Sequence, residues 1–269
     1  MKFDLHTHHE RCGHADGTIE DYITAALDAG LQAIGISDHS PYFGHKDDRP
    51  FPGIAMAQSE FDNYIKEVLE LKAKYEGRIE VLLGMESDFF PERLPAYRDA
   101  YEGVPFDYII GSVHQVSGVS IFNRNRWKGL TEKQQIEEKR RYYDLISQSA
   151  RSGMFNVLGH IDAMKGYYPA FSDIKADAEI DDTLRIIAEN DVSIEINTSG
   201  STKYVGGWYP SDDILERAHH FGVNVTFGSD AHIPARVGDD WDRVSKRLKE
   251  IGFNKWVFYR QRKQIIVPL

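Results

Sequence analysis

Residues 2–8 of the chain read K-F-D-L-H-T-H, a strand-like run that ends in two histidines, His6 and His8. Side chains alternate between the two faces of a strand, so His6 and His8 point to the same side. Two imidazoles on one side can reach a single metal ion. The run therefore predicts one half of a metal site at the end of the first strand.

The same pattern, an apolar run that delivers a metal-ligand residue type, recurs along the chain. Residues 33–36, 79–84, 108–113, 156–159 and 223–229 each have the composition of a strand. A single histidine at a strand end is weak support for a ligand, but its repetition at successive strand ends predicts metal binding. The residues delivered in this way are His39, Glu86, His114, His160, Asp230 and His232.

Segments with helical periodicity lie between these runs. Thr18 is placed to cap the first, and Thr131 with Gln134 predicts a capping box at the start of another. Alternating strands and helices predict an α/β fold with a parallel sheet, and seven such units favour one closed barrel over residues 1–269. Its ligands would lie at the carboxyl ends of the strands, where such barrels carry their chemistry. We expect helices at 19–29, 56–75, 131–151, 178–190, 211–221 and 241–251, and a last strand at 255–259.

The single cysteine, Cys12, excludes a disulfide within the chain and a thiolate zinc cluster. Any metal must be held by imidazole and carboxylate, and Zn, Mn and Fe all accept such ligands. A carboxylate that bridges two ions is predicted at Glu86, with a hydroxide between the ions as the nucleophile. The spacing leaves His14 open because it lies in a loop. We expect the remaining histidines to be solvated: His9, His45, His219 and His220.

The composition also restricts the partners. A formal net charge of -10 argues against an extended nucleic-acid surface, since phosphate backbones are bound by Lys and Arg, but it permits a small phosphorylated substrate. The chain has no apolar run of the roughly 20 residues that a membrane span needs, and no leader pattern. We expect a cytoplasmic protein without a membrane partner, and the oligomeric state stays open. The charged run 137–141 is expected to be a solvated helix face.

Six short motifs resemble, in this order, those of the polymerase and histidinol phosphatase (PHP) superfamily. They are D-L-H-T-H at 4–8, S-D-H at 37–39, G-M-E at 84–86, G-S-V-H at 111–114, G-H-I-D at 159–162 and G-S-D-A-H at 228–232. The resemblance implies a distorted seven-stranded (β/α) TIM-like barrel with two to three divalent ions. It implies three ligand sets: His6, His8, Glu86 and Asp230; then Glu86, His114 and His160; then His14, His39 and His232.

Within the superfamily the chain resembles the histidinol-phosphate phosphatase branch, through residues 9–15, 159–165 and 195–200. This resemblance implies hydrolysis of L-histidinol phosphate in histidine biosynthesis. We expect Glu86, Asp230 and His232 to be the catalytic residues, with Asp230 or His232 within reach of the leaving oxygen. The branch has an arginine shortly after N-T-S-G, whereas this chain has residues 201–203, Ser-Thr-Lys. Three alternatives stay open: a phosphodiesterase or nuclease, a phosphatase of another small monoester, and a barrel that binds metal without catalysis.

Cations in the loops after the strands are the candidates to bind phosphate oxygens that no metal reaches. Lys165 is the first choice because it lies five residues after His160. The other candidates are Lys203, Arg236 and Arg11. Two long loops, 42–52 and 115–129, follow ligands and are expected to shape the pocket for the leaving group, although Trp127 could equally anchor its loop to the core.

Overall fold

A computed structural model describes residues 1–204 and 206–269. Parallel pairing orders the central strands as β1-β2-β3 and as β10-β9-β8-β5-β4. All the pairs within these two groups are parallel. The strands are β1 (Phe3–Asp4), β2 (Ala33–Ile36), β3 (Glu80–Leu83), β4 (Glu86–Asp88), β5 (Ile110–Ser112), β8 (Val157–Leu158), β9 (Ser193–Asn197) and β10 (Val225–Gly228).

Two junctions join the groups into a ring. β4 continues the path of β3 after two residues, and a parallel bridge between His39 and Glu86 extends the pairing of β2. On the other side the amide of Leu5 donates to the carbonyl of Phe227 at 3.1 Å, and Thr7 bridges to Ala231. With β3 and β4 taken as one interrupted strand, the described residues form a seven-stranded parallel ring, which confirms the predicted barrel-like fold.

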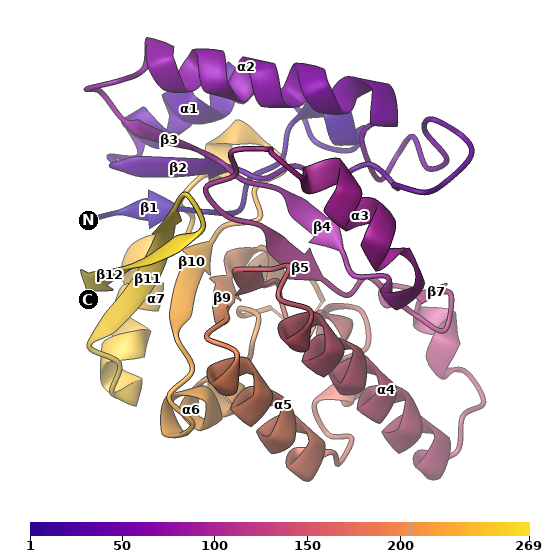
Figure 1. The fold of residues 1–269 in the computed structure, drawn as a ribbon. Coiled ribbons are helices and arrows are strands. Elements are labelled where there is room, and N and C mark those ends of the chain that lie inside the picture. Colours follow the sequence, from indigo (N-terminus) through magenta and orange to yellow (C-terminus); the bar gives the residue numbers. More distant parts are fainter. Residues whose placement is uncertain (205) are drawn as a thin grey trace.

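Helices cover the outside of the strands, with α1 and α2 on one side and α4 and α5 on the other (Figure 1). The six predicted helices are confirmed to within a few residues, and so are the N-cap at Thr18, which forms a capping box with Asp21, and the capping box of Thr131 with Gln134. α3 was not predicted, because eight residues that begin with Leu94-Pro95 are too short for a clear periodicity. The helices are α1 (Ile19–Asp28), α2 (Phe61–Lys74), α3 (Leu94–Tyr101), α4 (Glu132–Arg151), α5 (Asp177–Glu189), α6 (Asp212–His220) and α7 (Trp241–Ile251).

Short elements fill several loops that follow strand ends and so surround one mouth of the ring. The last predicted strand is present, but it pairs antiparallel in a hairpin with β12 and lies beside β10. The short helices are η1 (Glu10–Cys12), η2 (Gln58–Glu60), η3 (Pro91–Arg93), η4 (Arg124–Trp127), η5 (Ala163–Gly166), η6 (Pro169–Phe171), η7 (Thr198–Thr202) and η8 (Pro234–Arg236). The hairpins are β6 (Gln115–Val116) with β7 (Val119–Ser120), and β11 (Lys255–Arg260) with β12 (Lys263–Pro268).

The side chain of Tyr108 contacts three segments at strand ends, at Leu5, Gly35 and Gly84. Its hydroxyl donates to the carbonyl of Leu5 at 2.5 Å. A Cβ at Gly35 would lie 1.9 Å from this hydroxyl oxygen, and one at Gly84 would lie 2.5 Å from it. Glycine is therefore required at both positions, since protein interiors are close-packed and the tyrosine has no room to move.

One charged run differs from its prediction. Lys139 of α4 is buried rather than solvated, and its ammonium donates to the carbonyl oxygens of Phe171 at 3.0 Å and Ile174 at 2.8 Å. The long apolar stem of lysine allows it to lie against the ring of Phe171. Among the described residues, no helix combines the length and the apolar character needed to cross a bilayer.

Candidate metal centre

The structure brings all the predicted ligands together at the carboxyl ends of the strands. His6 and His8 are almost fully buried beneath a cavity of about 480 Å³. The other ligands line its wall: His14, His39, Glu86, His114, His160, Asp230 and His232. His14, which the spacing left open, therefore lies with the rest because the loop after β1 folds back over the site.

Glu86 lies at the centre of this group, and its two carboxylate oxygens face different imidazoles. Oε2 is 2.8 Å from His39 Nδ1 and also faces His6 and His8, at 3.5 and 3.6 Å from their Nε2 atoms. Oε1 is 3.0 Å from Nε2 of His160 and 3.4 Å from that of His114. A carboxylate shared in this way has the geometry of a bridging ligand.

Asp230 is oriented by two polar residues that the sequence analysis did not single out. Its Oδ2 accepts hydrogen bonds from Asn197 Nδ2 at 3.2 Å and Ser199 Oγ at 2.9 Å. Its Oδ1 is thereby turned toward His8 Nε2, at 3.0 Å. Asp230 and His160 both have a left-handed backbone, with φ of 52° and 27°. Such conformations cost about 1–3 kcal/mol each and are concentrated at functional sites.

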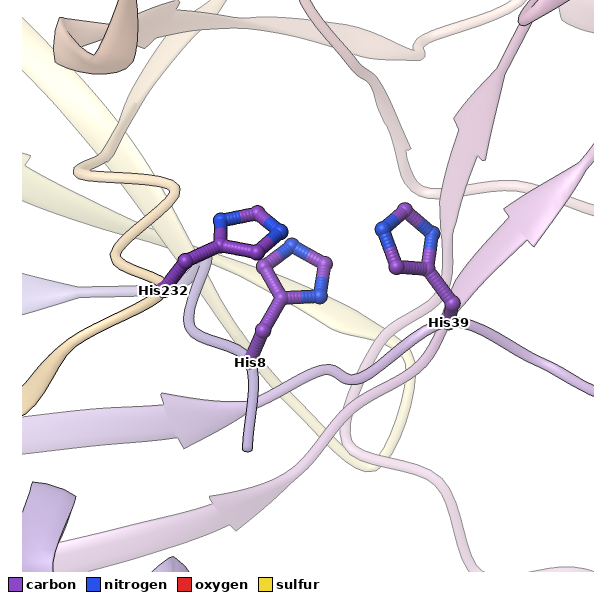
Figure 2. Close-up of side chains that lie close together, drawn as sticks. All are labelled: His8, His39 and His232. Atoms are coloured by element: carbon purple, nitrogen blue, oxygen red, sulfur yellow. The ribbon is translucent and has the colours of Figure 1, made fainter. Parts of the chain in front are cut away.

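Three imidazole rings stack on the cavity side of β1. The ring centroid of His8 is 4.1 Å from that of His232 and 4.3 Å from that of His39 (Figure 2). His14 Nε2 also lies 2.9 Å from His232 Nε2. Potential ligand atoms of His8, His39 and His232 all lie within 4.8 Å of one another. The same holds for the set of Glu86 with His6 and His8, and for the set of Glu86 with His39 and His114.

These atoms fit divalent metal ions. His6 Nε2, His8 Nε2 and Glu86 Oε2 are buried and make no well-directed hydrogen bond with the described residues, although His8 Nε2 lies 3.0 Å from Asp230 Oδ1 and Glu86 Oε2 lies 2.8 Å from His39 Nδ1. Unpaired buried polar atoms are costly and rare in native proteins, so each calls for an explanation. Two imidazole nitrogens on one tetrahedral zinc ion would be separated by about 3.3 Å. The separation of His114 Nε2 and His160 Nε2 is 3.3 Å.

Carboxylates behind the rings orient the imidazoles. The Nδ1 atoms of His6, His8 and His114 lie 2.7, 3.2 and 2.7 Å from carboxylate oxygens. A histidine that donates from Nδ1 to a carboxylate directs its Nε2 lone pair toward a metal. These partners were not predicted from the sequence, although Asp88 follows Glu86 by two residues and so lies on the same strand face. The partners are, in the same order, Glu195, Asp38 and Asp88.

The prediction that His9 is solvated is wrong. His9 is buried, and its ring stacks on Tyr64 with a centroid distance of 5.6 Å. The strand does not continue through His9, which instead caps η1, and the turn carries its ring into the core. His219 and His220 are exposed as expected, and the His45 side chain is 25% exposed.

Two of the four candidate cations reach the cavity. Lys203 and Arg236 line it, and Arg236 Nη2 is held by Ser201 Oγ at 3.1 Å and Asp239 Oδ2 at 2.9 Å. The aromatic ring of Phe122, from the loop 115–129, also lines the cavity.

The structure does not bring Lys165 and Arg11 to the described cavity wall. The ammonium of Lys165 is 2.7 Å from Asp162 Oδ2 and donates to the carbonyl of Trp208 at 2.7 Å. η5 begins directly after Asp162, and Lys165 lies on it three residues after Asp162. The two side chains therefore pair within this short helix. Arg11 pairs with glutamates on η2 and α2, Glu60 and Glu67.

The sequence profile of the PHP domain matches residues 4–199. The chain belongs to the PHP domain family. A relative from Deinococcus radiodurans named "Probable histidinol-phosphatase" is 33% identical, with 97% of each chain covered. The histidinol-phosphatase of Bacillus subtilis is 29% identical, with 92% of this chain and 99% of the relative covered.

A solved structure shares this PHP fold. It is the histidinol phosphate phosphatase of Lactococcus lactis in complex with zinc, L-histidinol and phosphate. The TM-score is 0.80 at 22% identity, and 98% of each chain is covered. At this identity the likeness establishes the fold, whereas the site must be argued from this chain's own residues.

The charges of this PHP centre favour cations. Burial lowers the pKa of His8, but the carboxylates of Asp230 and Asp38, at 3.0 and 3.2 Å from its ring nitrogens, outweigh burial and raise that pKa to about 9. Burial acts in the same way on His114, whose pKa the carboxylates of Asp88 and Glu86 raise to about 9. Without metal, the site therefore holds protons where it would hold metal ions.

The ligands nearest the cavity mouth behave differently. Burial, together with the charges of His39 and His8, lowers the pKa of His14 to about 4. Burial and the charge of His8 lower the pKa of His232 to about 3. Both rings are therefore neutral at physiological pH, which is the form that binds metal.

We predict that metal affinity rises with pH between about pH 6 and pH 9, because a metal must displace protons from His8 and His114. Their pKa values of about 9 mean that both are protonated at pH 6 and lose the proton only near pH 9. Calorimetry of Zn²⁺ binding in two buffers of different protonation enthalpy would measure the protons released. A pH-independent affinity with no proton release would contradict this picture.

Proposed function

We propose that this protein is a metal-dependent phosphomonoesterase that hydrolyses L-histidinol phosphate to L-histidinol and phosphate, as part of histidine biosynthesis. The observation that carries the proposal is a single cavity that combines the Glu86-centred ligand cluster with two cationic side chains, Lys203 and Arg236. The names of the relatives from Deinococcus radiodurans and Bacillus subtilis, together with their full-length similarity, support this substrate. We also propose that residues 1–269 act as one domain, since one buried cluster includes residues from Phe3 to Val267.

The proposed centre holds two to three divalent ions, with Zn, Mn and Fe as candidates. Glu86 is the bridging ligand, because its two oxygens face separate groups of imidazoles. Bound ions would supply a nucleophilic water at neutral pH and neutralise the charge of the phosphate oxygens. The remaining proposed ligands are His6, His8, His14, His39, His114, His160, Asp230 and His232.

The other residues of the cavity would bind and orient the substrate. Arg236, held in place by Ser201 and Asp239, presents a guanidinium suited to two phosphate oxygens. Phe122 and Tyr167 lie 5.1 Å apart between ring centroids and form an aromatic wall for the leaving group.

Asp230 and His232 are placed to move protons. Burial raises the pKa of the Asp230 carboxyl, but the charges of His6 and His8 outweigh burial and hold it well below its ordinary value. Because His232 is also unprotonated at neutral pH, both are in the form that accepts a proton. We assign the transfer of a proton between the attacking water and the leaving alkoxide to Asp230, through a carboxylate oxygen that no ion occupies, or to His232 if its Nε2 is not bound to an ion.

The test is an assay of phosphate release by metal-replete protein. L-histidinol phosphate, p-nitrophenyl phosphate and bis(p-nitrophenyl) phosphate would be compared at equal protein and metal concentrations. We expect the highest kcat/KM for L-histidinol phosphate and the lowest for the diester. A preference for the diester would favour a phosphodiesterase, and a lack of hydrolysis of all three would remove the enzymatic function.

We predict that Arg236→Met raises KM for L-histidinol phosphate about 10- to 100-fold, because charge-assisted hydrogen bonds contribute about 1.5–3 kcal/mol. Steady-state kinetics would measure the change. Arg243→Met is the matched control, because Arg243 is exposed and pairs with Asp240 outside the cavity wall. If Lys165→Met has the larger effect on KM in a protein of unchanged thermal stability, the first choice of the sequence analysis is correct instead.

A further inference from the structure

Asp38 is a fully buried carboxylate directly behind the stacked imidazoles. Its Oδ1 accepts from the backbone amide of His39 at 2.9 Å and lies 3.2 Å from His8 Nδ1. Its Oδ2 accepts from the amide of Cys12 at 3.1 Å and lies 3.4 Å from His9 Nε2. Four nitrogens thus converge on one carboxylate, which is close to its full capacity as an acceptor.

These nitrogens come from two segments that both carry proposed ligands. Residues 8–14 form the loop after β1, and His39 follows β2. Cys12 lies two residues before His14, and Gly13 between them has a left-handed φ of 88°. A Cβ at Gly13 would lie 2.0 Å from the carbonyl oxygen of Pro52, so the loop has one tight path. By fixing the amide of Cys12, Asp38 sets where this loop delivers His14.

Asp38 lies behind one side of the centre, which is formed by His8, His14, His39 and His232. His8 is the middle ring of the stack with His39 and His232, and His14 contacts His232. The opposite side depends on different carboxylates. Asp88 holds His114, while Glu195 holds His6 and accepts from the backbone amide of His160 at 2.9 Å. The two sides therefore have separate supports and share Glu86.

We propose that Asp38 is the positioning residue for the side of the centre formed by His8, His14, His39 and His232, so that its loss releases the ion of this side and spares the ion near His114 and His160. This inference rests on the proposed metal-dependent function. Asp38 acts through other residues and would not touch the substrate. Partners of this kind typically change metal affinity about 10- to 100-fold.

The experiment uses Asp38→Asn, which keeps the shape of the side chain but removes its charge and half of its acceptor capacity. Wild-type protein and variant would be loaded with Mn²⁺, and their metal content would be measured by mass spectrometry after dialysis. We expect one ion fewer per chain and, in titrations, a Kd for the weakest ion that is about 10- to 100-fold higher. Anomalous scattering from crystals of the loaded variant would locate the ions that remain.

Asp88→Asn is the matched control, because the same substitution there removes the carboxylate partner of His114. It should weaken the ion near His114 and leave the other side loaded. The proposal is overturned if Asp38→Asn keeps all its ions at wild-type affinity, or if both variants lose the same ion. A wild-type protein that binds no metal would instead refute the proposed function, so the two failures are distinguishable.

Circular dichroism and thermal unfolding in chelator would establish that the variants fold. Should Asp38→Asn not fold, His9→Leu removes one nitrogen from the same carboxylate and lies outside the ligand set. We expect a several-fold increase in Kd for the same ion, and an unchanged Kd would overturn the proposal.

Discussion

Glu86→Gln should reduce kcat for L-histidinol phosphate about 1,000-fold or more, which corresponds to about 4 kcal/mol of lost transition-state stabilisation. Glutamine has the shape of glutamate, but its amide cannot act as a charged bridge. In the structure the Glu86 carboxyl is buried, which by itself would raise its pKa, yet the charges of His39, His6 and His114 hold that pKa well below its ordinary value. The carboxylate is thus the negative charge around which the imidazoles gather.

Steady-state kinetics and metal analysis of the same preparation would measure this effect. The variant should also retain fewer ions than the wild-type protein, because both sides of the centre share Glu86. Glu92→Gln is the control, because Glu92 is exposed on η3 and its substitution removes the same charge far from the cavity wall. A Glu86→Gln variant with a tenth of the wild-type kcat, or more, would show that the bridge is not required.

Removal of metal should abolish activity and lower thermal stability together. An ion present at a free concentration about 1,000 times its Kd stabilises the folded chain by about 4 kcal/mol. For a chain of this size, removal of one such ion should lower Tm on the order of 10 °C. The physical reason is local: the buried nitrogens of His6 and His8 and an oxygen of Glu86 lose their partner. Their burial keeps water from replacing the metal.

Calorimetric melting curves and activity would be recorded before chelation, after chelation and after addition of Zn²⁺, Mn²⁺ or Fe²⁺ in turn. The metal that restores both activity and Tm at the lowest concentration is the best candidate for the native ion. Mg²⁺, which prefers oxygen ligands, is the negative control and should restore neither. Full activity after exhaustive chelation would argue against a metal-dependent enzyme.

Local features of the sequence were enough to predict the fold and all the proposed ligands except His14. Eight of the nine proposed ligands lie at or close after the end of an apolar run, so a one-dimensional pattern places them on the active face of the barrel. His14 lies in a loop and followed only from the resemblance to the PHP family. His6 and His8 needed only the period of a strand to be assigned to one side. Helix boundaries such as Thr131 followed from capping chemistry, which is also local.

Contacts between distant segments could not be predicted in this way. The distance of Lys165 from His160 along the chain predicts a phosphate ligand, yet the short helix that contains Lys165 turns its ammonium toward Asp162. Arg236 is fixed by Ser201, which lies on a loop from another strand. His9 is adjacent to a proposed ligand, but the turn that buries it depends on where the chain leaves β1.

The sequence by itself thus determined a parallel barrel whose strand ends carry imidazoles and carboxylates, because strand period and strand ends are local properties. Only the tertiary structure decided which carboxylate supports which imidazole, and which cations face the cavity. Asp38, Glu195 and Asp88 act across strands, and their partners are set by how the strands close into a ring. The run K-F-D-L-H-T-H by itself predicts half of a metal site. Closure of the ring places Glu195 behind His6 and Asp38 behind His8.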